Sequence, residues 1–267
     1  MLPLSDFKNP HIKFVFTDID DTLTENGKLG PEAYEALWSL EEKGVKIIPV
    51  TGRPAGWCEM IARFWPVDGV IGENGGLYFR CVENSKSGLT RMVRVFAIDE
   101  KTRNENRKIL DTVVAPEVLS NVPGSAVASD QFSRIMDLAI DFCEDVKPLA
   151  DKDVQKIVEI FETHKARAKI SSIHVNGWFG DYDKLSMCRQ YMKDVYKIDL
   201  VKEKEQCAFV GDSPNDEPMF GFFTNSFGVA NIDPFIKKIK SKPTYVSDKR
   251  GGSGFSEIAQ KIITCAN

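Results

Sequence analysis

The feature that most constrains this chain is an apolar run, Phe14 to Thr22, that ends in three carboxylates. The run is rich in β-branched and aromatic residues, which is typical of a buried strand. Side chains alternate along a strand, so Asp18 and Asp20 can face one side while Ile19 packs away from them. Open α/β sheets bind ligands at the carboxyl ends of their strands. The stretch therefore predicts a strand that delivers acid side chains to a ligand-binding crevice.

Two other interpretations fit an isolated Asp-x-Asp sequence. One is a polar strand end that simply starts a turn. The other is a calcium loop of the EF-hand kind, which requires Gly at its sixth position and Glu at its twelfth. This chain has Leu23 and Leu29 there. The calcium loop is therefore set aside, whereas the simple turn is weighed against the remaining motifs.

Length and composition favour an ordinary globular protein with a small-molecule partner. The chain has 267 residues, of which 42% are hydrophobic and 28% charged, enough for one large domain or two modest ones. Its net charge is −4 and its basic residues are dispersed, so no nucleic acid or anionic membrane partner is predicted. Residues 1–10 lack a signal-peptide pattern, and no apolar run approaches the roughly 18 residues of a membrane span. The oligomeric state is left undetermined.

The six cysteines lie at wide, irregular spacings without a Cys-x-x-Cys pair: Cys58, Cys81, Cys143, Cys188, Cys207 and Cys265. This spacing argues against a zinc site or a redox motif and favours reduced thiols. A cytoplasmic location is the resulting prediction.

A strand, helix, strand pattern follows the acid stretch. Segment 31–43 predicts a helix with a proline in its first turn, and segment 45–50 predicts the next strand. Short connections of this kind are typical of parallel βαβ units. The second strand ends in Thr51-Gly52-Arg53, before a helix predicted over 54–64. The Thr51 hydroxyl and free backbone N–H groups there are suited to an anion, although a simple helix cap explains the same residues.

The pattern of predicted elements changes in the middle part of the chain. The turn 72–76 predicts a hairpin, in which Glu73 and Asn74 either reach the site or serve only the turn. Beyond it, strands are predicted at 89–98, 135–142 and 170–175, and helices at 100–112 and 151–164. Because Gly-rich crossover turns vanish here, we interpret 84–177 as an α+β insertion.

The last part of the chain returns to the pattern of predicted elements seen in the first part. A buried strand over 207–210 ends in Gly211-Asp212-Ser213-Pro214-Asn215-Asp216. The other predicted elements are helices at 183–195, 217–222 and 253–263 and strands at 226–230 and 244–246, with Gly251, Gly252 and Gly254 as a flexible loop. The predicted fold class is α/β, with a Rossmann-like parallel sheet core of 1–83 and 178–267 and an inserted α+β cap domain of 84–177.

Three predicted strand ends carry polar groups that can act together: Asp18 with Asp20, Thr51, and Asp212 with Asn215 and Asp216. Parallel strands place their carboxyl ends on one edge of a sheet, so these groups are expected to converge. Lys184, at the start of the helix after the insertion, is the fourth element. Alone, a lysine there would be a solvated surface charge.

Together these motifs resemble those of the haloacid dehalogenase superfamily of phosphohydrolases, in order and in spacing. The four matching elements are Asp18–Thr22, Thr51–Arg53, Lys184 and Gly211–Asp216. The insertion is similar to that of the subgroup with an α+β cap, which includes Cof-like sugar phosphatases, sucrose- and trehalose-phosphate phosphatases and eukaryotic phosphomannomutases. One departure is Asp183-Lys184-Leu185, where many relatives have Lys-Gly.

The chemistry of the acids predicts a bound cation. At an effective dielectric constant near 20, a carboxylate about 4 Å from a phosphate dianion repels it by about 4 kcal/mol per charge pair. Oxygen ligands without His or Cys select Mg²⁺. We therefore assign Asp18, Asp20 and Asp212 to the metal, with Asp216 orienting a metal-bound water. The resemblance implies that Asp20 contributes its backbone carbonyl.

The same residues suggest a route for phosphoryl transfer. Asp18 would attack phosphorus and form an aspartyl-phosphate, and Asp20 would act as the general acid and base. The predicted phosphate contacts are Thr51, Gly52 with its neighbouring backbone N–H groups, Lys184, Asn215 and, as one of two options, Arg53. The other option for Arg53 is an ion pair between core and cap.

Substrate choice is expected to lie in the cap. Stretches 130–134 and 171–178 place polar groups beside aromatic rings, which suits sugars, and this favours a sugar phosphate as the substrate. The candidate contacts are Arg134, His174 and Asn176. In the alternative interpretation, Phe132 and Trp178 are cap core and His174 is an exposed strand residue.

Two other functions stay open. A phosphomutase of the phosphomannomutase type needs a second phosphate site, and the available arginines are scattered: Arg91, Arg94, Arg103, Arg107, Arg134 and Arg167. A non-catalytic ligand-binding relative would be expected to have lost an acid, whereas this chain keeps Asp18, Asp20 and Asp212.

Overall fold

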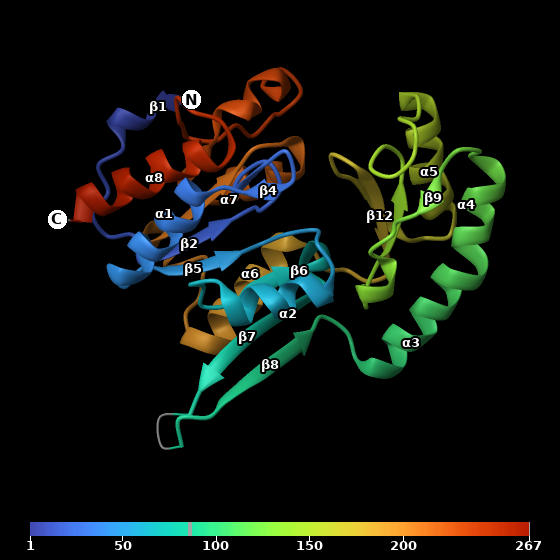
Figure 1. Cartoon of the computed structure of the whole chain (residues 1–267), viewed down its shortest axis with the longest axis horizontal. Helices are drawn as coiled ribbons and strands as arrows, with labels where there is room; N and C mark the ends of the chain where they lie inside the picture. Colours follow the sequence, from blue (N-terminus) through green and yellow to red (C-terminus); the bar gives the residue numbers. More distant parts are fainter. Residues whose placement is uncertain (85–86, 267) are drawn as a thin grey trace.

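A computed structural model describes residues 1–84 and 87–266. Its central sheet has six strands: β1 (Leu2–Pro3), β2 (Phe14–Thr17), β5 (Lys46–Pro49), β13 (Cys207–Gly211), β14 (Asn225–Gly228) and β15 (Tyr245–Val246). They follow the order β1-β15-β14-β13-β2-β5, and every neighbouring pair is parallel (Figure 1). The predicted α/β class with a parallel core sheet is confirmed.

Both faces of this sheet are covered by helices. The helices are α1 (Pro31–Glu42), α2 (Ala55–Phe64), α6 (Lys184–Tyr191), α7 (Glu217–Phe222) and α8 (Gly251–Ala266). On β2, Val15 packs into the cluster that includes α1, α2 and α8, whereas Phe14 and Phe16 pack into the cluster that includes α6 and α7. This burial on both sides explains why the strand is apolar along its whole length.

A second, antiparallel sheet extends the core beside β5. It contains β6 (Val70–Gly72), β7 (Leu77–Glu83) and β8 (Thr90–Phe96), and a parallel bridge between Val50 and Ile71 joins it to the strand end of β5. The predicted hairpin at 72–76 is the connection between β6 and β7. A two-stranded hairpin of β3 (Thr24–Glu25) and β4 (Lys28–Leu29) follows the acid stretch.

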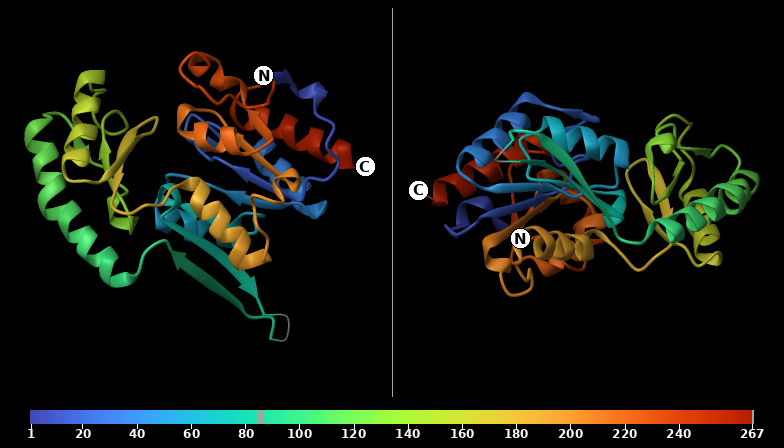
Figure 2. Two further views of the ribbon diagram at one scale, coloured as in Figure 1. Left: turned by 180° about the vertical axis from the view of Figure 1, so that it is seen from behind. Right: turned by 90° about the horizontal axis from the view of Figure 1, so that it is seen from below.

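The inserted part forms a third layer. Its sheet has the order β11-β12-β10-β9, with β9 (Ala126–Val127), β10 (Leu138–Asp141), β11 (Arg167–Ile170) and β12 (His174–Trp178). Helices α4 (Ala115–Asn121) and α5 (Asp151–Thr163) cover one face of it, and residues 110–114 join α3 (Glu100–Ile109) to α4 in one long helical segment. The other face turns toward the core (Figures 1 and 2).

The division into a core of 1–83 and 178–267 and a cap of 84–177 stays a prediction. Residues 85–86, at the proposed first boundary, lie outside the described residues. The pairing of β8 with β7 keeps residues 90–96 in the sheet of the core side. The chain passes to the third layer only after β8, as Figure 1 shows.

The strand predicted at 170–175 is wrong, because the segment contains a reversal. Strands β11 and β12 are antiparallel neighbours, and the turn between them spans 171–173. Ser171 closes this turn: its N–H donates to the His174 carbonyl (2.8 Å), and its hydroxyl accepts from the His174 N–H (2.9 Å). A serine that bonds to the backbone in this way competes locally with strand continuation.

The flexible glycine loop predicted before the last helix is also wrong. Helix α8 begins at Gly251 and contains all three glycines. A Cβ at Gly252 would lie 2.8 Å from the Leu23 carbonyl oxygen, and one at Gly254 would lie 2.7 Å from Ser247 Oγ. Gly252 therefore allows close packing of the helix start on the segment after the acid stretch, and Gly254 allows close packing on the residues that precede the helix.

Within residues 1–84 and 87–266, no helix combines the length and the apolar character needed to cross a membrane.

Candidate active site

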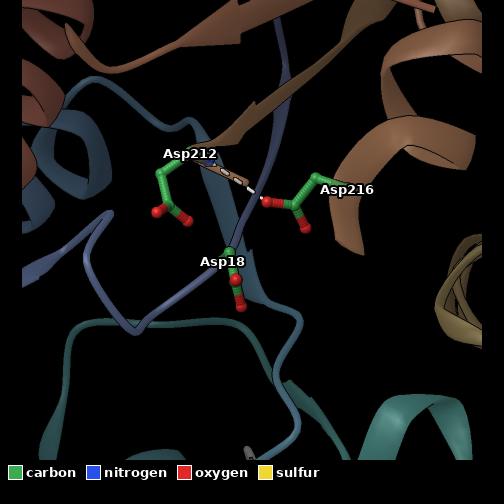
Figure 3. Close-up of side chains that lie close together, drawn as sticks. All are labelled: Asp18, Asp212 and Asp216. Atoms are coloured by element: carbon green, nitrogen blue, oxygen red, sulfur yellow. Dashed lines mark hydrogen bonds between the residues drawn. The ribbon is translucent and has the colours of Figure 1, made fainter. Parts of the chain in front are cut away.

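Three carboxylates converge where the two central strands end. Strands β2 and β13 are parallel neighbours with Thr17 opposite Val210, and the Asp18 N–H donates to the Val210 carbonyl (2.9 Å). This register places Asp18 and Asp212 at the same edge. Asp216, one turn later, accepts a hydrogen bond from the Asp212 N–H (3.1 Å). One oxygen from each of these three carboxylates lies within 4.8 Å of the others, and we call this group the acid cluster (Figure 3).

Lys184 supplies a positive charge to the acid cluster. Its Nζ lies 3.1 Å from Asp18 Oδ1 and 3.1 Å from Asp216 Oδ1. Asp183 and Ser186 form a capping box that starts α6 at this lysine. The backbone of Lys184 rests on Gly75, where a Cβ would lie 2.8 Å from the Lys184 N and φ is +96°. Only glycine suits both conditions at position 75.

Burial makes the acid cluster hard to ionise fully. Burial raises the pKa of Asp18 to about 7; Lys184 opposes this rise, whereas Asp216 and Asp20 add to it. Burial also raises the pKa of Asp212 to about 9, with further contributions from Asp216 and Asp18. A single ammonium group is too little positive charge for three carboxylates in so buried a place. The donor set, all carboxylate oxygen, fits a hard divalent cation.

Asp20 projects away from the acid cluster and pairs with Arg53. Arg53 Nε lies 3.0 Å from both oxygens of Asp20, and its Nη2 lies 2.8 Å from Oδ1. The other side of the guanidinium lies 4.0 Å from Glu144 Oε1, on the loop after β10. The Asp20 side chain is therefore not brought to the predicted metal site. Arg53 thus lies near the cap carboxylate of Glu144 and also lines the cavity, so both of its predicted options stay open.

A cavity of about 430 Å³ lies over the acid cluster, between the core and the third layer. Gly52, Lys184 and Asn215 line it, as predicted for phosphate contacts. Thr51 is completely buried and does not line it. Its hydroxyl accepts from the Arg53 N–H (3.0 Å), a contact within the loop. Helix α2 starts after Pro54 without a side-chain cap, so the simple helix cap of the alternative interpretation is wrong.

Two of the three candidate cap residues are well placed to meet a ligand. His174 and Asn176 line the cavity from β12. His174 is 2% exposed, so the alternative of an exposed strand residue is wrong. Its Nε2 lies 2.9 Å from Glu144 Oε2 but makes no hydrogen bond. Burial, followed by the charge of Arg134, lowers the pKa of His174 and favours its neutral form.

Arg134 also borders the cavity, but its guanidinium is fully engaged. Nε donates to Asp130 (2.9 Å), and Nη1 donates to Asp137 (3.0 Å) and to the Gly52 carbonyl (3.0 Å). Its side chain is 2% exposed. Arg134 is therefore a tie between the cap and the phosphate loop, which we define as Thr51–Arg53.

The aromatic residues do not lie where a sugar-stacking role would require them. Phe132 is 91% exposed, so its assignment to the cap core is wrong. Trp178 is buried and stacks on Tyr182, but it packs in the cluster of the core helices and not in that of the cap. Neither ring lines the cavity over the acid cluster, whereas Phe235 of the core does.

Sequence reasoning missed several residues around this cavity. Lys238 and Phe235 line it from the segment after β14, and no motif marks them. Glu144 touches Arg53 and His174 from a loop with no recognisable pattern. Asn74 was not missed: of the two options left open for it, the structure places it in the cavity lining, with a φ of +56° in the turn.

Comparison with known proteins agrees with this geometry. A sequence model of haloacid dehalogenase-like hydrolases matches residues 15–91. A phosphoglycolate phosphatase from Methanobrevibacter smithii is 25% identical over 95% of this chain and 99% of its own. Over these residues the chain is similar to the haloacid dehalogenase-like hydrolases, and over nearly its whole length it is similar to a phosphatase. The predicted enzyme class, a phosphoric monoester hydrolase, is supported by the family and by these phosphatase relatives.

Solved structures share the fold of this chain over nearly its whole length. The crystal structure of the Thermoplasma acidophilum 0175 protein has a TM-score of 0.70 at 20% identity and covers 94% of this chain and 98% of its own. The Synechocystis sucrose-phosphatase, in complex with sucrose and phosphate, has a TM-score of 0.62 at 16% identity and covers 94% and 98%. At these identities the likeness establishes the shared fold.

Proposed function

We propose that the protein is a Mg²⁺-dependent phosphatase that hydrolyses a small phosphate monoester, with a sugar phosphate as the favoured substrate. The observation that carries this proposal is the contact of Lys184 Nζ with both Asp18 and Asp216, 3.1 Å from each, beneath a closed-over cavity. A reactive carboxylate, a fixed cation and a place for a second cation are what phosphoryl transfer requires.

The residues fit a magnesium ion. Asp18 and Asp212 would hold it, and Asp216 would orient one of its waters, since all three offer oxygens to one small space. When bound, the ion would offset the negative charge that a phosphate brings to these acids. The family resemblance implies that Asp20 would contribute its backbone carbonyl; its side chain is paired with Arg53.

The residues of the chain then divide the chemistry. Asp18 would attack phosphorus to form an aspartyl-phosphate, and Lys184 would hold a phosphoryl oxygen together with Asn215 and the backbone of Gly52. Asp20 lines the same cavity and would protonate the leaving oxygen and then accept a proton from the attacking water. For this acid and base role, Arg53 must bind the Asp20 carboxylate less tightly than it does in this structure.

The cap side of the cavity supports a polyhydroxylated substrate. Ser171, Ser172, His174 and Asn176 line it and provide hydrogen-bonding groups within a space large enough for a sugar phosphate. Two neighbouring folds belong to sugar phosphatases, one of them bound to sucrose and phosphate.

A phosphorylated carboxylic acid is the second candidate substrate. One relative is named a phosphoglycolate phosphatase. Lys238, which lines the cavity on the core side, offers a cation for a carboxylate. A phosphomutase is less well supported, because Arg134 alone among the six cap-region arginines lines the cavity, and its guanidinium is engaged.

A substrate screen tests the proposal. Sugar phosphates, phosphoglycolate, nucleotides and phosphopeptides are incubated with the protein in magnesium or in chelator, and both released phosphate and isomerised product are measured. We expect magnesium-dependent release of phosphate, highest with a sugar phosphate. Preference for nucleotides or phosphopeptides would remove the substrate assignment, and turnover that persists in chelator would contradict the metal.

A further inference from the structure

Glu73 is a completely buried carboxylate that the proposed mechanism does not use. It lies in the turn between β6 and β7, with a φ of +46° that few non-glycine residues adopt. Its Oε1 accepts from the Ala55 N–H and from the Ile135 N–H, each at 2.9 Å. Its Oε2 accepts from the N–H groups of Met136 (2.5 Å) and Asp137 (3.0 Å). One core side chain thus binds three consecutive backbone N–H groups of the inserted part.

The same turn is bonded to the phosphate loop. The Glu73 N–H donates to the Arg53 carbonyl (3.1 Å), and the Asn74 N–H donates to the Thr51 carbonyl (3.1 Å). Ala55, which Glu73 also binds, begins α2 just after this loop. Glu73 is therefore fixed to the loop on one side and to the cap segment 135–137 on the other.

The cap segment 135–137 connects Glu73 to a residue that lines the cavity. Asp137, whose N–H is held by Glu73, is itself fully buried and accepts a hydrogen bond from Asn176 Nδ2 (3.0 Å). It also binds Arg134, which donates to the Gly52 carbonyl. Asn176 lines the cavity. A continuous set of contacts therefore runs from the phosphate loop through Glu73 and Asp137 to a residue that faces the ligand.

We propose that Glu73 is a positioning residue that fastens the cap to the phosphate loop and sets where the cap side chains stand over the acid cluster. Burying a carboxylate costs folding free energy unless hydrogen-bond donors replace the lost water. The buried carboxylate of Glu73 is therefore stable only while its four backbone N–H donors are in place. Those donors come from core and cap together, so the two parts must be docked for the charge to be satisfied. The expected effect on selectivity rests on the proposed phosphatase function, whereas the docking itself does not.

Glu73→Gln is the sharpest test of the docking. The amide keeps the size of the side chain but presents an NH₂ group to backbone donors, so at least one pair of N–H groups loses its acceptor. We expect the amide protons of Ile135, Met136 and Asp137 to exchange with solvent at least about tenfold faster, which reports local opening. Amides of α5, inside the cap, should be unchanged. Glu59→Gln, on the exposed side of α2, is the matched control and should change none of these rates.

Substrate discrimination is the second readout. The ratio of kcat/KM for an accepted sugar phosphate to that for para-nitrophenyl phosphate should fall at least about tenfold in Glu73→Gln, mainly through KM. Selective exchange without a changed ratio would refute the role in selectivity. A proportional rise in exchange over the whole chain with a lower Tm would refute the docking role, since it would show a general loss of stability.

A measurement on the unchanged protein covers the case in which Glu73→Gln does not fold. The N–H groups of Cys143, Glu144 and Asp145 are also held by one carboxylate, Asp141, but within the cap alone. If Glu73 fastens the cap, the amide hydrogens of 135–137 should exchange with solvent only through global unfolding. Their exchange should then be slower than that of the amides of 143–145. Faster exchange at 135–137 than at 143–145 would overturn the proposal. None of these exchange readouts depends on activity, so they separate this inference from the proposed function.

Discussion

On the core side of the cavity, Asp18 and Asp212 stand at the ends of neighbouring parallel strands, whereas on the cap side His174 and Asn176 stand on a strand of an antiparallel sheet. The core acids are fixed by the register of one sheet, so their distance follows directly from backbone pairing. The cap groups are fixed by side-chain contacts between two separately packed units, through Asp137 and Glu73. Catalysis therefore depends on strand register in the core, whereas selectivity depends on contacts between core and cap. A substitution can change one without changing the other.

The largest effect is expected on the core side from Asp18→Asn. An amide is a poor nucleophile, so turnover should fall at least about a thousandfold, or about 4 kcal/mol in the activation barrier. Since burial disfavours a charge at this position, the free energy of unfolding should stay equal or increase. Phosphate release and thermal unfolding check both statements. Asp6→Asn, at an exposed acid, is the control; near-normal turnover in Asp18→Asn would refute the nucleophile.

Packing at the junction is tested by two aromatic substitutions. Trp178→Ala removes a buried ring that stacks on Tyr182 and should cost about 3 to 4 kcal/mol of unfolding free energy. Phe132→Ala removes a ring that is 91% exposed and should change the unfolding free energy by less than about 0.5 kcal/mol. Chemical denaturation measures both. Similar losses in the two variants would show that Phe132 is covered in solution.

The acid cluster predicts a magnesium effect that grows with pH. Asp18 and Asp212 have pKa values raised to about 7 and about 9, so in the metal-free protein folding favours their protonated forms. Stability present at low pH is then lost as pH rises through these values. Magnesium replaces the protons, so its stabilisation, about 2.7 kcal/mol at about 100 times its Kd, should increase over this range. Thermal unfolding with magnesium or chelator tests this; a magnesium effect that shrinks with pH would contradict it.

A smaller effect on catalysis than that of Asp18→Asn is expected on the cap side from His174→Ala. Because the side chain contacts the cavity but not the acid cluster, kcat/KM for a sugar phosphate should fall about tenfold, with a smaller change for para-nitrophenyl phosphate. Steady-state kinetics with both substrates measures the difference. Equal losses for the two would mean that His174 supports the reaction centre itself, and the separation between core and cap would fail.

Much of the core could be predicted because local pattern and topology agree there. The apolar run before Asp18 and the strand before Asp212 have no other stable place than the centre of a parallel sheet, and their ends must meet. The prediction failed where one contact overrode the pattern. Ser171 reverses a chain that reads as a single strand, and the packing of α8 on Leu23 turns a glycine-rich loop into a helix start. Phe132 looked like core but lies at the surface.

The parallel core sheet and the convergence of Asp18, Asp212 and Asp216 could be predicted from strand alternation and the common edge of parallel strands, and Lys184 from its motif. The pairing of Asp20 with Arg53, the burial of Thr51 outside the cavity lining and the contact of Glu73 with the cap became visible only in the folded structure. The physical reason is that such contacts join segments with no periodic relation. Their geometry depends on how two packed units dock, which no local pattern encodes.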